Sequence, residues 1–148
     1  MKKLLVFSVI ALALISCGKD KFKTEPQVEI KSLAPSEVNK GELFTFRAVV
    51  RDQEGDLQDS VLLVRKRFTG ATLLTVDTLR YDISSFAFPD KTVIEISAVF
   101  SYGEFRDGYI FANLENQDRE FALGIIVRDK AGHRSEYQES DKILLKRL

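Results

Sequence analysis

From Gln27 onward, apolar residues alternate with polar ones, and this period of two most restricts the possible fold. Successive side chains of a β-strand point to opposite faces of the sheet, so the alternation predicts half-buried strands. It is clearest in LFTFRAVVRD (43–52), VIEISAVF (93–100) and REFALGIIVRD (119–129). Strong helical patterns with a period of 3.6 residues are absent from the sequence. The chain is therefore expected to be all-β.

Four further segments are rich in aliphatic and β-branched residues, and turn signals separate all seven. These segments are residues 28–33, 60–68, 73–83 and 142–148. Spacings of roughly 8 to 20 residues, without crossover helices, favour a single antiparallel β-sandwich of about seven strands. An up-and-down barrel is the alternative. About 120 residues suffice for one domain and are too few for two of ordinary size.

Two stretches allow a more specific comparison: residues 32–64 (SLAPSEVNKGELFTFRAVVRDQEGDLQDSVLLV) and 121–136 (FALGIIVRDKAGHRSE). They resemble immunoglobulin-like domains of bacterial surface and periplasmic proteins, in which one strand ends in an Asp-Gly-Asp-like loop and a later one in an Asp-x-Ala-Gly-Asn turn. His133 replaces the usual Asn, and the Cys–Trp–Cys core of antibody domains is missing. The resemblance implies a disulfide-free immunoglobulin-like sandwich over residues 27–148.

Residues 1–16 have the layout of a secretory leader. Lys2 and Lys3 precede an apolar run from Leu4 to Ile15, which matches the basic and apolar regions of a signal peptide. A membrane-spanning helix needs about 20 apolar residues, more than this run offers. We expect a signal peptide, followed by a flexible polar tether over residues 17–26.

Leu14-Ile15-Ser16-Cys17 resembles the lipobox of bacterial lipoproteins, in which lipid is attached to the cysteine and cleavage makes that cysteine the first residue. The resemblance implies lipid attachment at Cys17, the only cysteine of the chain. Several acyl chains hold a protein on a bilayer far more firmly than one. Gly18 stands where an Asp would retain an enteric lipoprotein at the inner membrane. The resemblance therefore implies the outer membrane, with the domain facing either the periplasm or the cell surface.

Composition and motifs argue against nucleic-acid binding and catalysis. The chain has 22 basic and 22 acidic residues, and this balance argues against nucleic-acid binding driven by a basic surface. The only histidine, His133, lies in a predicted turn, whereas a Ser-His-Asp site needs a positioned imidazole. A zinc site needs about four ligands, which one histidine and no spare cysteine do not supply. Nucleotide binding has no support either, because no glycine-rich phosphate loop precedes a helix. We expect a protein that is not an enzyme.

Acidic residues mark two loops that an immunoglobulin-like sandwich would bring together. Asp52 and Asp56 follow the strand predicted from residue 43, and Asp129 ends the strand predicted from residue 119. Such loops lie at the same end of the sandwich, and calcium takes six to eight oxygen ligands. These three residues are the candidate calcium site, and no other cofactor is expected. The alternative is that Asp and Gly serve only the turns, because Asx side chains hydrogen-bond their own backbone.

Aromatic residues mark a long connection, SYGEFRDGYIFANLENQDRE (101–120). Phe105, Tyr109 and Phe111 are candidate ligand-binding residues, since rings on loops can stack on sugars or anchor a protein partner. The alternative is that these rings cover the open end of the core. The basic run RKRF (65–68) is interpreted as alternation along an exposed strand, in preference to an anion site.

Together these features predict a membrane-anchored, non-catalytic lipoprotein of the Gram-negative outer membrane. Its immunoglobulin-like domain would bind an envelope or surface protein, or a glycan. The alternative is a carbohydrate-binding accessory lipoprotein of a surface uptake system, which requires Phe105, Tyr109 and Phe111 to be exposed and roughly coplanar.

Overall fold

The computed structural model describes residues 24–57, 59–82, 92–111 and 117–147. Ten strands and no helix occur in these ranges, which confirms the all-β prediction. The strands are β1 (Gln27–Ala34), β2 (Glu37–Val38), β3 (Leu43–Arg51), β4 (Ser60–Thr69), β5 (Thr72–Asp82), β6 (Val93–Tyr102), β7 (Tyr109–Phe111), β8 (Arg119–Arg128), β9 (Gln138–Glu139) and β10 (Ile143–Leu145). The predicted signal peptide, Cys17 and most of the tether lie outside the described residues. Among the described residues, no helix is long and apolar enough to cross a membrane.

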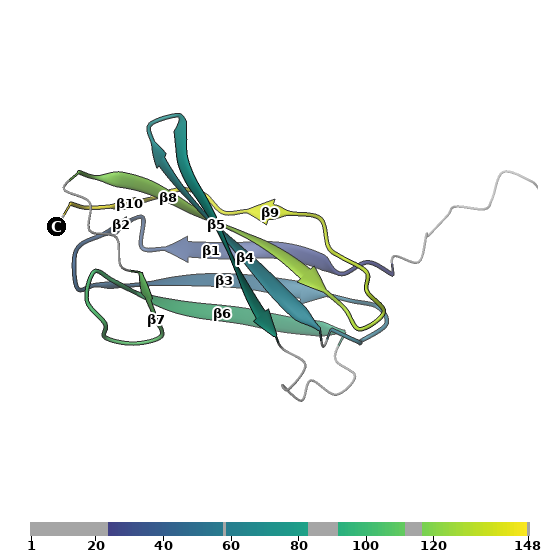
Figure 1. Ribbon diagram of the computed structural model, residues 1–148. Coiled ribbons are helices and arrows are strands. Elements are labelled where there is room, and N and C mark those ends of the chain that lie inside the picture. The colour runs from purple at the N-terminus through teal and green to yellow at the C-terminus, as the bar shows by residue number, and fades with distance from the viewer. Residues whose placement is uncertain (1–23, 58, 83–91, 112–116, 148) are drawn as a thin grey trace, which may run out of the picture.

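The strands form two sheets that pack face to face (Figure 1). One has the order β1-β3-β6-β7, and the other has the order β2-β10-β8-β4-β5, with β9 paired to β8. Pairing is antiparallel except for the two short contacts of β10 with β2 and of β6 with β7. Apart from the short strands β7 and β9, the sheets correspond to A-B-E and A′-G-F-C-C′ in immunoglobulin letters. The fold is therefore an immunoglobulin-like sandwich, and the barrel alternative is wrong.

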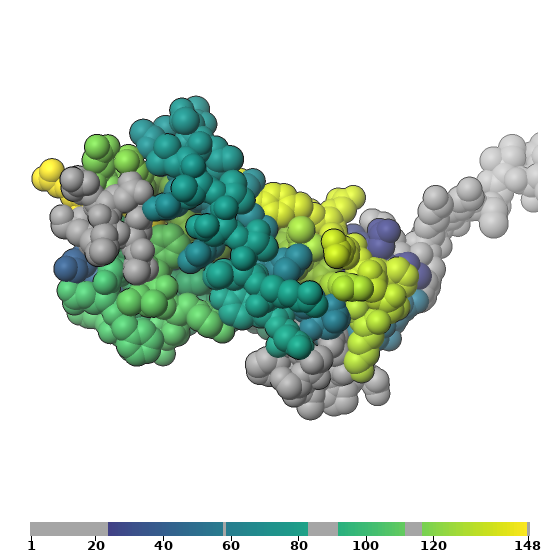
Figure 2. Space-filling model, in the orientation of Figure 1, coloured from purple at the N-terminus to yellow at the C-terminus, as the bar shows by residue number. Residues whose placement is uncertain are grey.

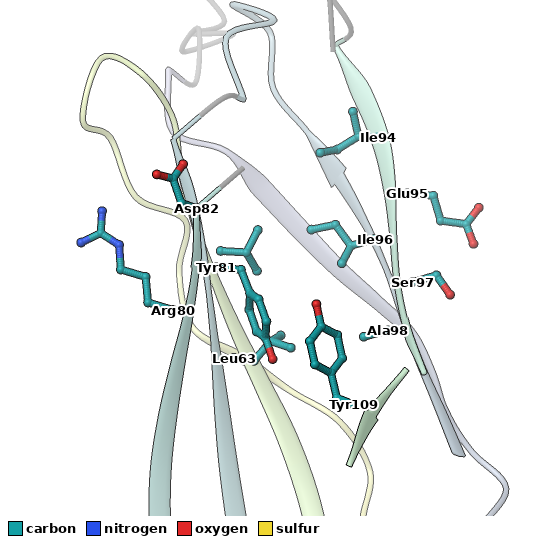
Figure 3. Close-up of a pocket in the computed structure, with 11 residues that line it drawn as sticks. Leu63, Arg80, Tyr81, Asp82, Ile94, Glu95, Ile96, Ser97, Ala98 and Tyr109 are labelled. Carbon is teal, nitrogen blue, oxygen red and sulfur yellow. The ribbon is translucent and has the colours of Figure 1, made fainter. Parts of the chain in front are cut away.

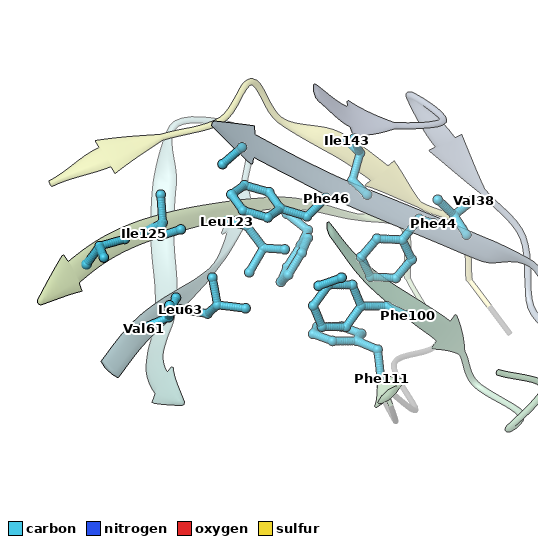
Figure 4. Close-up of a cluster of buried hydrophobic side chains, with 14 of the residues drawn as sticks. Val38, Phe44, Phe46, Val61, Leu63, Phe100, Phe111, Leu123, Ile125 and Ile143 are labelled. Carbon is cyan, nitrogen blue, oxygen red and sulfur yellow. The ribbon is translucent and has the colours of Figure 1, made fainter. Parts of the chain in front are cut away.

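The core lies between the sheets and is supplied by the alternating positions of the long strands (Figure 4). On β3, every second side chain is fully buried, as the period of two predicts. On β8 the alternate residues from Phe121 to Val127 are buried too, but so are Ala122 and Gly124 between them, and Tyr137 lies over Gly124. Phe44 stacks on Phe100 at 5.0 Å and meets Phe121 edge-on at 5.8 Å, measured between ring centroids. Such pairs add about 0.5–1.5 kcal/mol beyond the buried area. The aromatic core thus replaces the disulfide and tryptophan of antibody domains.

The ends of the sandwich differ in the loops that they carry. Gln27, where β1 begins, pairs with Arg51, where β3 ends, so the chain enters the domain beside the loop that contains Asp52. At the opposite end, Leu43 pairs with Ser101, and the aromatic connection begins there. The length of β6, roughly 30 Å, separates the acidic loops from the aromatic connection.

Candidate functional sites

Asp52, Asp56 and Asp129 converge at the end of the sandwich where the chain enters. One carboxylate oxygen from each lies within 4.8 Å of those from the other two. The loops are joined by a backbone hydrogen bond of 3.1 Å from the amide of Lys130 to the carbonyl oxygen of Asp56. Asp52 and Asp129 are buried, while Asp56 is half-buried. The structure therefore brings together the three residues that the sequence nominates for calcium.

The same carboxylates also hold their own loops in shape. Asp52 accepts hydrogen bonds from the backbone amides of Glu54 (3.3 Å) and Asp56 (3.1 Å). Asp129 accepts one from the amide of His133 (2.8 Å), and its other oxygen lies 3.0 Å from the His133 ring nitrogen Nδ1. These are the local bonds that the turn interpretation expects. Asp56 Oδ1 differs, because it is buried without a hydrogen-bond partner.

The electrostatics of this acidic cluster favour a cation. Burial raises the pKa of Asp52 and the neighbouring Asp56 carboxyl raises it further, while the amides of Glu54 and Asp56 lower it. Each carboxylate oxygen has a second lone pair available after it accepts one amide hydrogen. Calcium binds carboxylates and carbonyls of flexible loops with adaptable geometry. The three residues therefore fit a calcium site whose remaining ligands would be backbone carbonyls or water.

We predict that millimolar calcium raises the melting temperature of the protein by several degrees, because a ligand that binds only the folded state stabilises it. Asp56→Asn should abolish this shift, since it removes one ligand charge. Asp141→Asn is the matched control, because Asp141 is exposed and outside the cluster. Differential scanning fluorimetry with calcium, and separately with magnesium, measures the effect. If calcium leaves the melting temperature unchanged, these carboxylates serve the turns alone.

The structure separates the three candidate aromatic residues. Phe105 and Tyr109 are 67% and 48% exposed, but Phe111 is only 6% exposed. The Phe111 ring packs on Phe121 at 4.6 Å and on Phe44 at 5.9 Å. The expectation that all three rings are exposed is therefore wrong for Phe111. It fails because β7 pairs with β6, which places Phe111 beside the buried Tyr102 and turns its ring into the core.

A buried serine shapes the loop that presents Phe105. Ser101 Oγ accepts hydrogen bonds from the amides of Arg106 (2.9 Å) and Asp107 (2.8 Å) and donates one to the carbonyl oxygen of Asp107 (2.6 Å). Gly108, with φ of 63°, then returns the chain towards β6. Sequence reasoning overlooked Ser101, because a serine at a strand end gives no signal of such a role.

Tyr109 lines a pocket of about 510 Å³ at the open side of the sandwich, between β5 and β6 (Figure 3). Its apolar wall is supplied by Val61, Leu63, Ile94, Ile96 and Ala98. Tyr81 and Tyr109 approach from opposite sheets, with ring centroids 5.2 Å apart. Burial raises the pKa of Tyr81, and the nearby Tyr109 hydroxyl raises it further. Apolar walls with a few polar groups are typical of sites for small apolar molecules or single side chains.

The geometry of this tyrosine-lined pocket bears on the carbohydrate alternative. The planes of Tyr81 and Tyr109 meet at 60°, so the two rings do not form a flat platform for a sugar. Sequence reasoning found Tyr109 and missed Tyr81. The signal was available, since Tyr81 and Leu79 occupy alternate positions of LLTVDTLRYDI, and both are half-buried on the face that looks towards the other sheet.

The basic run of β4 alternates between the faces of the sheet, as expected, and its cations have partners. Arg65 lies 3.7 Å from Asp77 and its guanidinium carbon is 5.5 Å from the centre of the Phe111 ring. On the other face, Lys66 contacts the Glu139 carboxylate and lies 4.8 Å from the centre of the Tyr137 ring. This pairing favours the structural interpretation of the run over an anion site.

These features define the class of protein: an immunoglobulin-like β-sandwich with an acidic loop cluster at one end and a tyrosine-lined pocket at its open side. The sequence matches no protein-family model and no curated protein. Three solved structures illustrate the similarity. The sporulation control protein Spo0M from Bacillus subtilis aligns with a TM-score of 0.47 and 10% identity, over 84% of this chain and 50% of that one. The present chain thus spans half the length of Spo0M.

The other two are more distant in shape. A β-glucosidase from Listeria innocua in complex with gluconolactone has a TM-score of 0.38 and 10% identity, over 82% of this chain and 16% of the enzyme. The CARDB domain of the PF1109 protein from Pyrococcus furiosus, in complex with di-metal ions, has a TM-score of 0.31 and 12% identity, over 84% and 88%. Similarities at this level carry no information about activity.

Proposed function

We propose that this protein is a membrane-anchored, non-catalytic lipoprotein of the Gram-negative outer membrane that presents an immunoglobulin-like interaction domain to an envelope or surface partner. The observation that carries the proposal is the sequence Leu14-Ile15-Ser16-Cys17 at the end of the apolar leader. The start of the domain sets how far it can lie from the membrane. β1 begins at Gln27, so a tether from Cys17 would hold the domain within at most about 35 Å of the bilayer.

The position of Gln27 shows which end of the domain the tether reaches. The tether reaches the domain beside the acidic loops, because Gln27 pairs with Arg51. The acidic loops would therefore lie at the tethered end of the domain, and the loop with Phe105 would lie at its free end. Phe105 would be free to contact a partner, since its side chain is mostly exposed. Confinement at the membrane would raise the effective concentration of the domain for such a partner.

The experiment that tests the anchor is Cys17→Ala in cells that process lipoproteins. We expect this substitution to abolish incorporation of a labelled fatty acid and partitioning into the detergent phase, because the acylated thiol is lost. Ser8→Ala, which leaves the cysteine in place within the same leader, is the control and should retain both properties. Unchanged labelling and partitioning of the Cys17→Ala protein would contradict the proposal.

Cells that make the unaltered protein then show on which side of the outer membrane the domain lies. Protease added to intact cells would degrade a domain on the surface, and partners there would be glycans or surface proteins. Protection until the outer membrane is permeabilised would place the domain in the periplasm, among envelope-assembly proteins.

A further inference from the structure

The β5 strand forms an edge of the larger sheet and projects with β4 as a long hairpin. β5 is the last strand in the sheet order and pairs with β4 alone among the strands of the described residues. The hairpin (teal) stands out at the top of the molecule in Figure 2. An edge strand carries a row of backbone amides and carbonyls that can pair with another strand. The edge of β5 therefore offers a backbone surface for association.

The first half of β5 lacks side chains that would protect this edge. Leu73, Leu74 and Val76 are all about half exposed, and no charged residue occurs in β5 before Asp77. Proteins usually protect long edges with lysine, proline or an inward-pointing charge, and the first half of β5 has none of these. A register shift in the pairing with β4, opposite Arg67 and Phe68, lies close to the tip of the hairpin. It leaves regular pairing from Thr75 to Asp82. Within this regular part Val76, at 51% exposed, is the most exposed apolar side chain.

We propose that the β5 edge pairs with β5 of a second copy of this chain, antiparallel, about a two-fold axis at Val76. This register sets Val76 against its own copy, Thr75 against Asp77 of the second copy and Leu74 against Thr78 of the second copy. The apolar residues then meet apolar or neutral residues, and no like charges are opposed. An axis one residue later would set Asp77 against its own copy, and like charges directly opposite one another are destabilising.

The symmetry of this contact limits its size. A two-fold contact uses the same strand of both copies, so it closes as a dimer and leaves no second β5 edge for further growth. The contact covers one edge only, which places it among the smaller and weaker interfaces in solution. The dimer does not require lipid at Cys17, so its test is independent of the test of the proposed anchor.

The test introduces a charge of either sign at Val76 and measures self-association by sedimentation equilibrium. The full chain carries Cys17→Ala, which removes lipid as a variable, and is kept in mild detergent so that the apolar leader stays dispersed. Val76→Lys and Val76→Glu each set two like charges opposite one another across the axis. We expect each variant alone to self-associate at least about tenfold more weakly than its parent. A mixture of the two should recover association, because Lys then faces Glu.

Val93→Lys provides the control, since Val93 is 50% exposed on the other sheet and Val76 is 51% exposed. It should associate as the parent does, and urea unfolding should show that all three variants remain folded. A parent protein with a dissociation constant above about 1 mM would overturn the proposal. So would a dimer that neither Val76 variant weakens, or variants whose mixture fails to recover association.

Discussion

Phe111→Ala is expected to lower the free energy of unfolding by about 3–5 kcal/mol, the usual cost of truncating a buried phenylalanine. The ring is 6% exposed and contacts both Phe44 and Phe121. Its removal would leave a cavity between the sheets, and the short strand β7 has few other core contacts to hold it. This effect would establish Phe111 as a core residue, in place of the ligand-binding role that the sequence suggests.

The matched control for this prediction is Phe105→Ala in the same connection. Phe105 is 67% exposed, and surface substitutions of this kind usually change stability by less than about 0.5 kcal/mol. Urea unfolding of the two full-length variants, followed by circular dichroism, gives the comparison directly. Equal and small losses for both variants would mean that the Phe111 ring is not packed in the core.

The long strands were predictable because each carries its own local signal. In β3 the alternation of buried and less buried positions is set by the period of the strand itself. In β8 the expected side chains are buried, but Ala122 and Gly124 between them are buried as well, which the period alone does not predict. The meeting of Asp52, Asp56 and Asp129 was also predictable. It requires only the immunoglobulin-like arrangement, in which these loops share one end.

The short strands β2, β7 and β9 could not be predicted, since each has only two or three residues and is defined by a neighbour far away in sequence. β7 determines which aromatic residues of the connection are buried. Its parallel pairing with β6 turns Phe111 inward and leaves Tyr109 at the open side, facing Tyr81. Nothing local distinguishes these outcomes, because both aromatic residues occur in the same run of the sequence, YIF.

Gly108→Ala is expected to cost about 2–5 kcal/mol, from a left-handed backbone that disfavours a Cβ atom and from overpacking. Gly108 has φ of 63°, and a Cβ atom there would lie 2.1 Å from the carbonyl oxygen of Val99. The obstacle is backbone of β6, which cannot move aside without disturbing the ladder to β3. The close approach at Gly108 is what allows β7 to pair with β6 and Tyr109 to reach Tyr81.

Gly70→Ala separates the two contributions, because Gly70 has φ of 56° with no atom within 4 Å of a Cβ atom. It should cost only the left-handed penalty of about 1–2 kcal/mol, so urea unfolding should show a clearly larger loss for Gly108→Ala. Since the tyrosine-lined pocket depends on the same approach, Gly108→Ala should also increase the exposure of Tyr109, which tyrosine fluorescence quenching can detect. Equal losses for the two glycine variants would mean that the chain does not approach β6 this closely, and that the pocket is formed in some other way.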